Sequence, residues 1–278
     1  MENYNEFISL GLSEKTNEVI RKKGFEKPTP IQALAIPVLV NSESDVIGLA
    51  QTGTGKTAAY GLPIVDKIEE GVGYVQAIIL VPTRELALQV TEEMNSFKGS
   101  RRLQIISVYG GQSISEQLRR LKQGVEIVVG TPGRILDHLS RGSLKLDRVK
   151  WVVLDEADEM LNMGFVEDIE SILSHAPEER RTLLFSATMP DRIARLSKKY
   201  MKSPQRLEIE RQQMTTNLTD QIYFEVHESN RFDALTRIID IEPEFYGLVF
   251  CRTRVAVDEL VARLIEHGYA ADGLHGEV

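Results

Sequence analysis

The apolar run Val46–Leu49 leads directly into a glycine-rich loop, Ala50-Gln51-Thr52-Gly53-Thr54-Gly55-Lys56-Thr57. The loop fits the pattern G-x-x-x-x-G-K-S/T except at its first position, where Ala50 replaces glycine. Gly53 and Gly55 permit the positive φ angles and the close backbone approach by which loop N–H groups surround a phosphate. The next segment, 56–68, is predicted to be a helix whose N-terminus adds positive dipole. These residues therefore predict a strand, a phosphate-binding loop and a helix in succession.

A second apolar run, Trp151–Leu154, ends in a cluster of carboxylates, Asp155-Glu156-Ala157-Asp158. Lys56 is expected to reach the β- and γ-phosphates, and Thr57 and Asp155 to ligate Mg²⁺, Asp155 directly or through water. Glu156 is the candidate to orient or deprotonate the attacking water. Either string alone also fits an ordinary turn. Together, each after a buried strand, they predict a site that binds and hydrolyses a nucleoside triphosphate with Mg²⁺.

Short apolar runs alternate with helical patterns from residue 46 to about 210. This alternation is typical of an α/β fold with a doubly wound parallel sheet. The predicted strands are Val46–Leu49, Ala77–Val81, Gln104–Val108, Ile127–Val129, Val152–Leu154 and Thr182–Phe185. The predicted helices between them include Thr83–Phe97, Ser113–Gln123, Pro132–Ser140, Phe165–Ser174 and Asp191–Tyr200, with Glu14–Lys23 and Pro30–Val40 ahead of the sheet.

Further motifs occur in a fixed order around these two strings. They are Gly24-Phe25-Glu26-Lys27-Pro28-Thr29-Pro30-Ile31-Gln32, Pro82-Thr83-Arg84-Glu85-Leu86-Ala87, Gly110-Gly111, Thr131-Pro132-Gly133-Arg134 and Ser186-Ala187-Thr188. With them, the whole chain resembles the DEAD-box RNA helicases of superfamily 2. The residues 159–165, E-M-L-N-M-G-F, most resemble the bacterial cold-shock, DeaD-like type. The resemblance implies a RecA-like ATP-binding domain that uses ATP and Mg²⁺ and binds RNA.

The resemblance assigns a role to each motif. Gln32 would pair with adenine through its amide, which can both donate and accept. Phe7 and Phe25 would pack on the base or hold this segment in the core, and the sequence leaves both open. The implied ATP-binding set is Phe7, Phe25, Lys27, Thr29, Gln32, Ala50, Gln51, Thr52, Gly53, Thr54, Gly55, Lys56 and Thr57. The implied catalytic set is Lys56, Asp155, Glu156, Asp158, Ser186 and Thr188. Ser186 and Thr188 are expected to bond to the acidic tetrapeptide, at Asp158, and so to couple nucleotide state to domain closure.

The resemblance also implies an RNA-binding rim that contacts the sugar-phosphate backbone without reading the base sequence. Preference for RNA would come from contacts to 2′-hydroxyl groups. The implied RNA-binding residues are Pro82, Thr83, Arg84, Gly110, Gly111, Thr131, Pro132, Gly133, Arg134, Arg252 and Thr253.

The pattern divides the chain into residues 1–205, a RecA-like domain, a polar linker at 206–220, and residues 221–278, the start of a second, incomplete RecA-like domain. The predicted elements of the last part are the strands Ile222–Val226 and Leu248–Cys251 and the helices Arg231–Ile239 and Val255–His267. Because the family's second domain extends further, we expect this chain to be a fragment without the family's arginine fingers, which are worth about 10³–10⁵ in rate. Weak or absent activity of the isolated chain is the corresponding expectation.

Composition excludes several other classes of protein. The chain has 278 residues, 42% of them hydrophobic, with a single cysteine, Cys251, so a disulfide framework and a zinc cluster are excluded. No apolar run has the length of a membrane span and no signal peptide is recognisable, which predicts a cytoplasmic protein without a membrane partner. The net charge is −8. Tight non-specific RNA binding is therefore not expected from this segment as a whole, and RNA contacts depend on local charge.

Three functions remain open at this level. The first is an ATP-dependent RNA helicase in which ATP and RNA close two domains and separate a short duplex. The second is an ATP-gated RNA clamp or assembly scaffold with little unwinding activity, which would use the same motifs. The third, a DNA-directed motor or a generic P-loop ATPase, is disfavoured by the adenine-reading segment and by the full ordered set of motifs.

Overall fold

The computed structural model describes residues 6–209, 220, 222–242 and 244–276. The chain divides into two compact units, residues 1–212 and 213–278. The first contains the sheet and the second contains a pair of helices, so each is described by itself.

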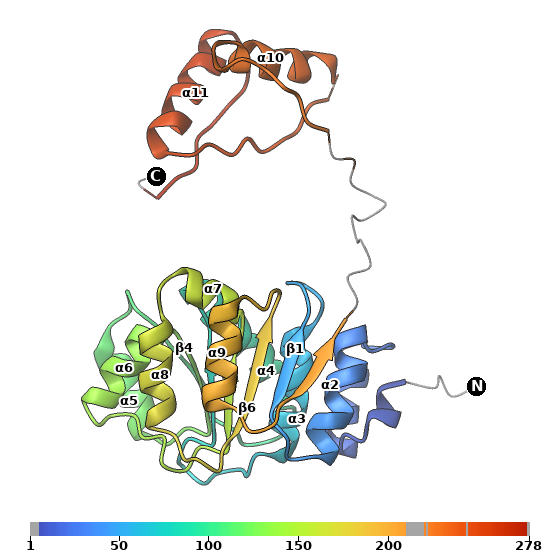
Figure 1. Ribbon diagram of the computed structural model, residues 1–278, viewed down its shortest axis with the longest axis vertical. Coiled ribbons are helices and arrows are strands. Elements are labelled where there is room, and N and C mark those ends of the chain that lie inside the picture. The colour runs from blue at the N-terminus through green and yellow to red at the C-terminus, as the bar shows by residue number, and fades with distance from the viewer. Residues whose placement is uncertain (1–5, 210–219, 221, 243, 277–278) are drawn as a thin grey trace. The chain divides into compact units, whose positions relative to one another are not determined.

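A parallel sheet forms the centre of the first unit (Figure 1). Within the described residues it has seven strands in the order β3-β4-β2-β5-β6-β1-β7. The strands are β1 (Val46–Leu49), β2 (Ala77–Leu80), β3 (Ile105–Val108), β4 (Ile127–Gly130), β5 (Trp151–Leu154), β6 (Arg181–Ser186) and β7 (Gln205–Glu208). β1, β2, β4, β5 and β6 are buried at every position. Continuous apolar runs are what a sheet covered on both faces requires, and here they end together at one edge.

Helices cover both faces of the sheet and enclose two hydrophobic cores. One core is built on η1 (Glu6–Leu10), α1 (Glu14–Lys22), α2 (Pro30–Asn41), α3 (Lys56–Lys67) and α4 (Arg84–Phe97). The other is built on α6 (Pro132–Ser140), α7 (Ala157–Asn162), α8 (Val166–Ser174) and α9 (Asp191–Tyr200), with α5 (Ile114–Lys122) packed beside it through Leu121. The predicted α/β fold with a doubly wound parallel sheet is therefore confirmed.

The six predicted strands are all present, with bounds that shift by at most a residue at either end. A seventh strand was not expected, because Gln205–Glu208 falls at the boundary where the polar linker was predicted. These residues pair in parallel with β1 and form an edge strand whose side chains are mostly exposed. A polar edge strand gives no apolar run, so the hydrophobic pattern does not reveal it. The rest of the predicted linker, residues 210–219, lies outside the described residues.

The second unit contains the two predicted helices, α10 (Arg231–Ile241) and α11 (Arg254–Glu266). The two predicted strands are wrong for the described residues, since neither Ile222–Val226 nor Leu248–Cys251 takes strand structure there. A strand needs neighbours that bond its N–H and C=O groups, and none pairs with these segments in the described part of the unit. Their apolar side chains are left exposed, with Phe250 at 91% and Tyr223 at 85%.

No helix in the described ranges combines the length and the apolar character that a membrane crossing would need.

Candidate nucleotide site and basic rim

The glycine-rich loop joins β1 to α3 and has the backbone shape that the sequence predicts. Gly53 and Gly55 have φ values of 79° and 85°, in the left-handed region. A Cβ atom on Gly55 would lie 2.4 Å from Nε2 of Gln32, so a larger residue would be strained by the positive φ and would displace the Gln32 amide. Ala50, at the departure from the usual pattern, is buried and donates its N–H to the Ser186 carbonyl, 3.0 Å away. The loop is therefore tied to the sheet at its start and to the Gln32 segment at its end.

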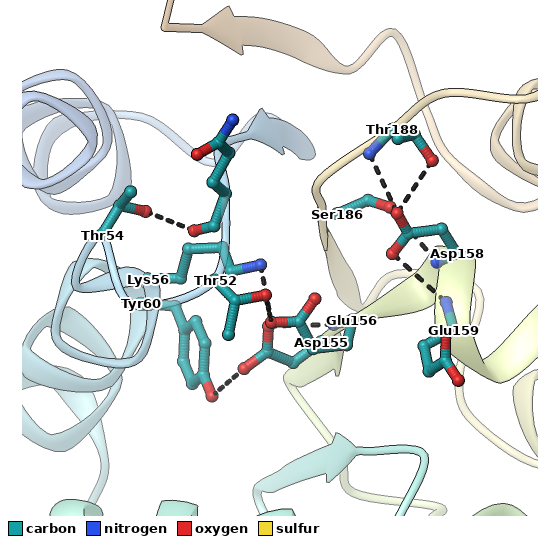
Figure 2. Close-up of polar contacts among 11 residues, drawn as sticks. Thr52, Thr54, Lys56, Tyr60, Asp155, Glu156, Asp158, Glu159, Ser186 and Thr188 are labelled. Carbon is teal, nitrogen blue, oxygen red and sulfur yellow. Dashed lines mark hydrogen bonds and ion pairs between the residues drawn. The ribbon is translucent and has the colours of Figure 1, made fainter. Parts of the chain in front are cut away.

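Lys56, at the start of α3, forms an ion pair with Glu156 across the carboxyl edge of the sheet (Figure 2). The Lys56 Nζ to Glu156 Oε1 distance is 2.9 Å, and only 5% and 13% of the two side chains are exposed. The Thr52 hydroxyl donates to the same oxygen at 3.0 Å. Figure 2 shows all three side chains pointing toward one another. The predicted phosphate-binding lysine and the predicted water-orienting carboxylate are therefore in direct contact.

Asp155 follows β5 and lies beneath this pair. Its Oδ2 accepts a hydrogen bond from the Tyr60 hydroxyl at 2.8 Å, and its Oδ1 accepts the backbone N–H of Glu156 at 3.0 Å. Burial raises the pKa of Asp155 from its ordinary 3.8 to about 6, although Lys56 and the Tyr60 hydrogen bond act in the opposite direction. Burial, together with Asp155, raises the pKa of Tyr60, so this phenol remains a hydrogen-bond donor.

Glu156 has φ 50° and ψ 50°, a left-handed conformation that is uncommon for any residue other than glycine. The Asp155 carboxylate holds the Glu156 N–H, and the Glu156 carbonyl accepts from Glu159 and Met160 at the start of α7. The turn therefore aims the Glu156 side chain back toward Lys56. Strained backbone of this kind collects at functional sites, where surrounding contacts hold it in place.

Asp158 connects the acidic turn to the loop after β6. Its carboxylate accepts from the Thr188 N–H at 3.0 Å and from the Thr188 hydroxyl at 2.8 Å, and its own N–H donates to the Ser186 hydroxyl at 3.2 Å (Figure 2). Partial burial raises the pKa of Asp158, but the bonds from Thr188 and Ser186 outweigh it and the net shift is downward. The expected contact between these residues is therefore present.

The segment ahead of the sheet places Gln32 against the phosphate loop. Gln32 is buried, its Oε1 accepts the Thr29 N–H at 2.9 Å, and its Nε2 donates to the Gly55 carbonyl at 3.1 Å. Each amide atom keeps one further position for a ligand, since Oε1 has two lone pairs and Nε2 two hydrogens. Lys27 is exposed. Phe7 is 1% exposed and stacks on the half-buried Phe25 at 6.1 Å, so Phe7 belongs to the core in this structure.

These residues fit a nucleotide with its magnesium ion. The loop has glycines in the left-handed region at Gly53 and Gly55, and it ends on a buried lysine. Thr57 lies half-buried in the first turn of α3, the position of a hydroxyl ligand to Mg²⁺. The Thr29 hydroxyl lies beside Gly55 at the N-cap of α2, where Thr29 and Gln32 form a capping box.

The predicted RNA-binding residues of the first unit follow three adjacent strands, β2, β3 and β4. Arg84 is exposed at the start of α4, where Thr83 caps the helix by accepting the Leu86 N–H at 3.2 Å. Arg134 is half-buried in the first turn of α6. These residues, which we name the basic rim, are Pro82, Thr83, Arg84, Gly110, Gly111, Thr131, Pro132, Gly133 and Arg134. Because parallel strands end at one edge, the rim and the nucleotide site share that edge of the sheet.

Two other predicted RNA-binding residues, Arg252 and Thr253, belong to the second unit. Arg252 is exposed, and Thr253 caps α11 by accepting the Ala256 N–H at 3.2 Å. They are therefore not part of the basic rim.

Three residues with a place in the site were not predicted from the sequence. Tyr60 bonds Asp155, and its spacing of four from Lys56 on one helix is the signal that points to it. Gln117 and His138 are buried behind the basic rim and bond each other. No local motif contains both, so only the fold brings them together.

Residues 29–196 match the family described as DEAD/DEAH box helicase. The chain belongs to that family. Over 272 residues, 98% of this chain, it is 52% identical to DEAD-box ATP-dependent RNA helicase CshA of Geobacillus kaustophilus (strain HTA426) and covers 58% of that protein. It is 51% identical to ATP-dependent RNA helicase CshA of Listeria monocytogenes, of which it covers 52%.

The fold of this DEAD/DEAH box family member is similar to the crystal structure of a DEAD box protein from the hyperthermophile Methanococcus jannaschii. The TM-score is 0.72 at 47% identity, over 99% of this chain and 74% of that chain. The predicted resemblance to DEAD-box helicases and the RecA-like fold class are thus confirmed. The chain spans little more than half the length of these two curated relatives.

Proposed function

We propose that this chain is the nucleotide-binding and part of the RNA-binding machinery of an ATP-dependent RNA helicase. The observation that carries the proposal is the juxtaposition of Lys56, Glu156 and Asp155 at the end of a glycine-rich loop, on the sheet edge that also holds the basic rim. The similar proteins named as ATP-dependent RNA helicases support the same reaction class.

In this proposal ATP enters the glycine-rich loop and Gln32 selects adenine. The Gln32 amide uses its two remaining hydrogen-bonding positions, one donor and one acceptor, for the base. Lys56 exchanges its bond to Glu156 for the β- and γ-phosphates, and the backbone N–H groups of the loop surround the phosphates. Thr57 and Asp155 would hold Mg²⁺, directly or through water, and the ion would neutralise charge on the phosphates.

Release from Lys56 gives Glu156 its catalytic role. Its carboxylate becomes available to orient the attacking water and to accept a proton from it. The left-handed turn and the Asp155 to Glu156 N–H bond fix where that carboxylate points. Asp158, bonded to Thr188 and Ser186, links the same turn to the loop after β6, so that a change at the nucleotide can be passed to domain closure.

RNA would lie on the basic rim, held through its phosphates and 2′-hydroxyl groups, together with Arg252 and Thr253 of the second unit. Contacts to the backbone do not read sequence, which suits an enzyme that acts on many duplexes. Base-pair stacking is worth about 1.4 kcal/mol per step in DNA, so closure of two domains on RNA can separate a few pairs but not a long duplex. We place this activity in the cytoplasm, as predicted from the sequence.

The deciding experiment is steady-state ATP hydrolysis by the 278-residue chain with and without single-stranded RNA, beside a Lys56→Ala control. RNA-stimulated hydrolysis that is abolished in the control would support the proposal. ATP binding without RNA stimulation would assign only the nucleotide-binding role to this chain. Unwinding of a short duplex by the protein in its full length then separates a helicase from an ATP-gated clamp, which would bind RNA with ATP and leave the duplex paired. Stimulation by DNA rather than RNA would overturn the proposal.

A further inference from the structure

A buried polar network lies behind the basic rim, between α5 and α6. His138 is 0% exposed and Gln117 is 2% exposed. The His138 Nε2 and Gln117 Oε1 atoms are 3.0 Å apart. Burying two polar side chains is costly unless they form hydrogen bonds. The hydrogen-bond partners of this pair therefore show which groups the pair fixes in place.

The Gln117 amide reaches the loop that carries Gly110 and Gly111. Its Nε2 donates to the Tyr109 carbonyl at 3.0 Å and to the Gln112 Oε1 at 3.1 Å. These two contacts flank the glycine pair on either side. Gln117 therefore holds the loop at the Tyr109 backbone and at the Gln112 side chain, while Gly110 and Gly111 between them are exposed.

The same amide also reaches Arg134. The Arg134 Nη1 atom lies 3.4 Å from Gln117 Oε1 and 3.4 Å from the Gln112 carbonyl. These contacts are at the long end of hydrogen bonding, so they guide the guanidinium without consuming all of its donors. A third rim residue depends on the network indirectly, because the Arg84 guanidinium lies over the Tyr109 ring, 5.2 Å from its centroid.

His138 fixes the orientation of the Gln117 amide. Since Gln117 Oε1 can only accept, His138 Nε2 must carry the hydrogen of that bond, and Nδ1 then faces the Ser143 hydroxyl at 2.9 Å. Burial, and after it the charge of Arg134, lowers the pKa of His138. The lowered pKa favours the neutral ring, in which Nδ1 can accept from the Ser143 hydroxyl; the same hydroxyl also lies 3.0 Å from the His138 carbonyl, to which it can donate instead. A flipped Gln117 amide would turn its N–H groups toward Arg134 and leave the loop unheld.

We propose that Gln117 and His138 are a positioning pair that holds Arg134 and the Gly110–Gly111 loop in the arrangement that binds the RNA backbone. This inference rests on the proposed function, because it assigns the pair a role only if the basic rim binds RNA. The pair itself touches no RNA. Its effect passes through Arg134, the Tyr109 backbone and the Gln112 side chain.

The test measures binding of a short fluorescein-labelled single-stranded oligouridylate to the 278-residue chain by anisotropy, across a range of salt concentrations. Arg134→Ala sets the scale and is expected to weaken binding about tenfold. His138→Leu removes the donor to Gln117 and is expected to weaken binding about fivefold, with a salt dependence lowered by about one charge. His138→Gln, whose amide can donate from a similar place, is expected to restore most of the affinity.

A solvated histidine supplies the matched control. His175, exposed at the end of α8, contacts only the Ser171 carbonyl through Nδ1 among the hydrogen bonds described. His175→Leu makes the same chemical change away from the rim and is expected to leave RNA binding unaltered. Thermal unfolding and ATP affinity, measured for each variant, identify any that fails to fold. In that case Gln117→Glu, which keeps a polar side chain but removes the Nε2 donor to the loop, replaces His138→Leu, and the same loss of affinity is expected.

The double variant distinguishes positioning from simple support of the fold. If His138 acts through Arg134, then His138→Leu adds little to Arg134→Ala, and the two effects are strongly non-additive. Full additivity would overturn the positioning role. If Arg134→Ala weakens RNA binding while His138→Leu does not, the inference fails and the proposed function stands. If neither variant nor the parent chain binds RNA, the RNA-binding part of the proposed function itself fails, and only the nucleotide-binding role remains.

Discussion

The nucleotide site and the basic rim lie on the same edge of one sheet, but they are built in opposite ways. Lys56, Asp155 and Glu156 are nearly all buried, and they bond one another or Tyr60 at distances of 2.8 to 3.0 Å. Arg84 is exposed, and Arg134 is guided by two contacts of 3.4 Å from a network behind it. Bond cleavage requires groups that are desolvated and fixed in advance, whereas RNA must be bound and released repeatedly.

This contrast predicts how the two regions respond to substitution. Removing one member of a buried ion pair leaves the other charge unpaired in a site of low polarity, which is costly. Removing an exposed arginine forfeits little more than its own interaction with RNA. Substitutions in the nucleotide site are therefore expected to abolish function, and those in the rim to reduce it by degrees.

The largest effect is expected from Lys56→Ala. Loss of the ammonium group removes the charge that faces the phosphates and leaves the Glu156 carboxylate without its partner. We expect ATP turnover by the protein in its full length to fall about 10³-fold, the scale for losing a buried electrostatic contact to the transition state. Lys150→Ala is the control, because Lys150 pairs with Glu69 at 2.6 Å where both side chains are more than half exposed. Equal turnover in the two variants would contradict the assignment of Lys56.

Glu156→Gln separates binding from chemistry in the same site. The amide keeps the size of the side chain and can accept from Lys56 but cannot take a proton from water. We expect turnover to fall about 10²–10³-fold with ATP affinity retained. Glu159→Gln, three residues along and exposed, is the matched control. Measured ATP binding with full turnover in Glu156→Gln would remove Glu156 from the water-activating role.

The pH dependence of stability reports the cost of burying Asp155. Its pKa is about 6 in the folded chain and 3.8 ordinarily, so between these values the folded state holds a proton that the unfolded state has released. The contribution of Asp155 to the free energy of unfolding therefore falls as the pH rises from 3.8 to about 6, by about 2–3 kcal/mol, and this contribution is constant above that window. Chemical denaturation with EDTA present, comparing the parent chain with Asp155→Asn at several pH values, measures it. A difference between the two that is independent of pH would show that Asp155 is not the source.

Tyr60→Phe tests the buried hydrogen bond from the Tyr60 hydroxyl to the Asp155 carboxylate. Without the hydroxyl, Asp155 keeps only the Glu156 N–H and its carboxylate can rotate. We expect the Mg²⁺ concentration for half-maximal hydrolysis to rise about tenfold, since a hydrogen bond to a charged group is removed. Tyr200→Phe, on α9, controls for the general loss of a phenol. An unaltered Mg²⁺ requirement in Tyr60→Phe would mean that the hydroxyl serves stability alone.

These residues also show how far sequence reasoning reaches. Lys56, Asp155 and Glu156 stand in local patterns at the ends of apolar strands, so both their elements and their convergence follow from the parallel fold. Tyr60 could be placed on the face of a helix but not against Asp155, because that contact depends on how α3 packs on β5. The left-handed turn at Glu156 could not be predicted, because the residue in the left-handed conformation is not a glycine.

Other features were out of reach for different reasons. The strand β7 is polar and exists only because β1 offers it hydrogen bonds. The opposite error occurs in the second unit, where 248–251 has the composition of a strand and no partner strand in the described residues. Strand pairing depends on two segments. The hydrophobic pattern of one segment indicates only which of its faces would be buried.

The smallest effect is expected from Arg84→Ala, at the exposed end of the comparison. Its guanidinium lies over the Tyr109 ring and makes no ion pair among those described. Removing one phosphate-binding group from a solvated site should weaken binding of single-stranded RNA about threefold and lower the salt dependence by about one charge. Arg119→Ala, on the exposed surface of α5, removes the same charge elsewhere and should change neither quantity. ATP binding measured without RNA should be unaltered. The effects of Arg84→Ala and Tyr60→Phe on the free energy of activation for RNA-stimulated hydrolysis should add, because the two residues share no partner. Strong non-additivity between the two substitutions would show that the basic rim and the nucleotide site form one coupled network rather than two independent regions.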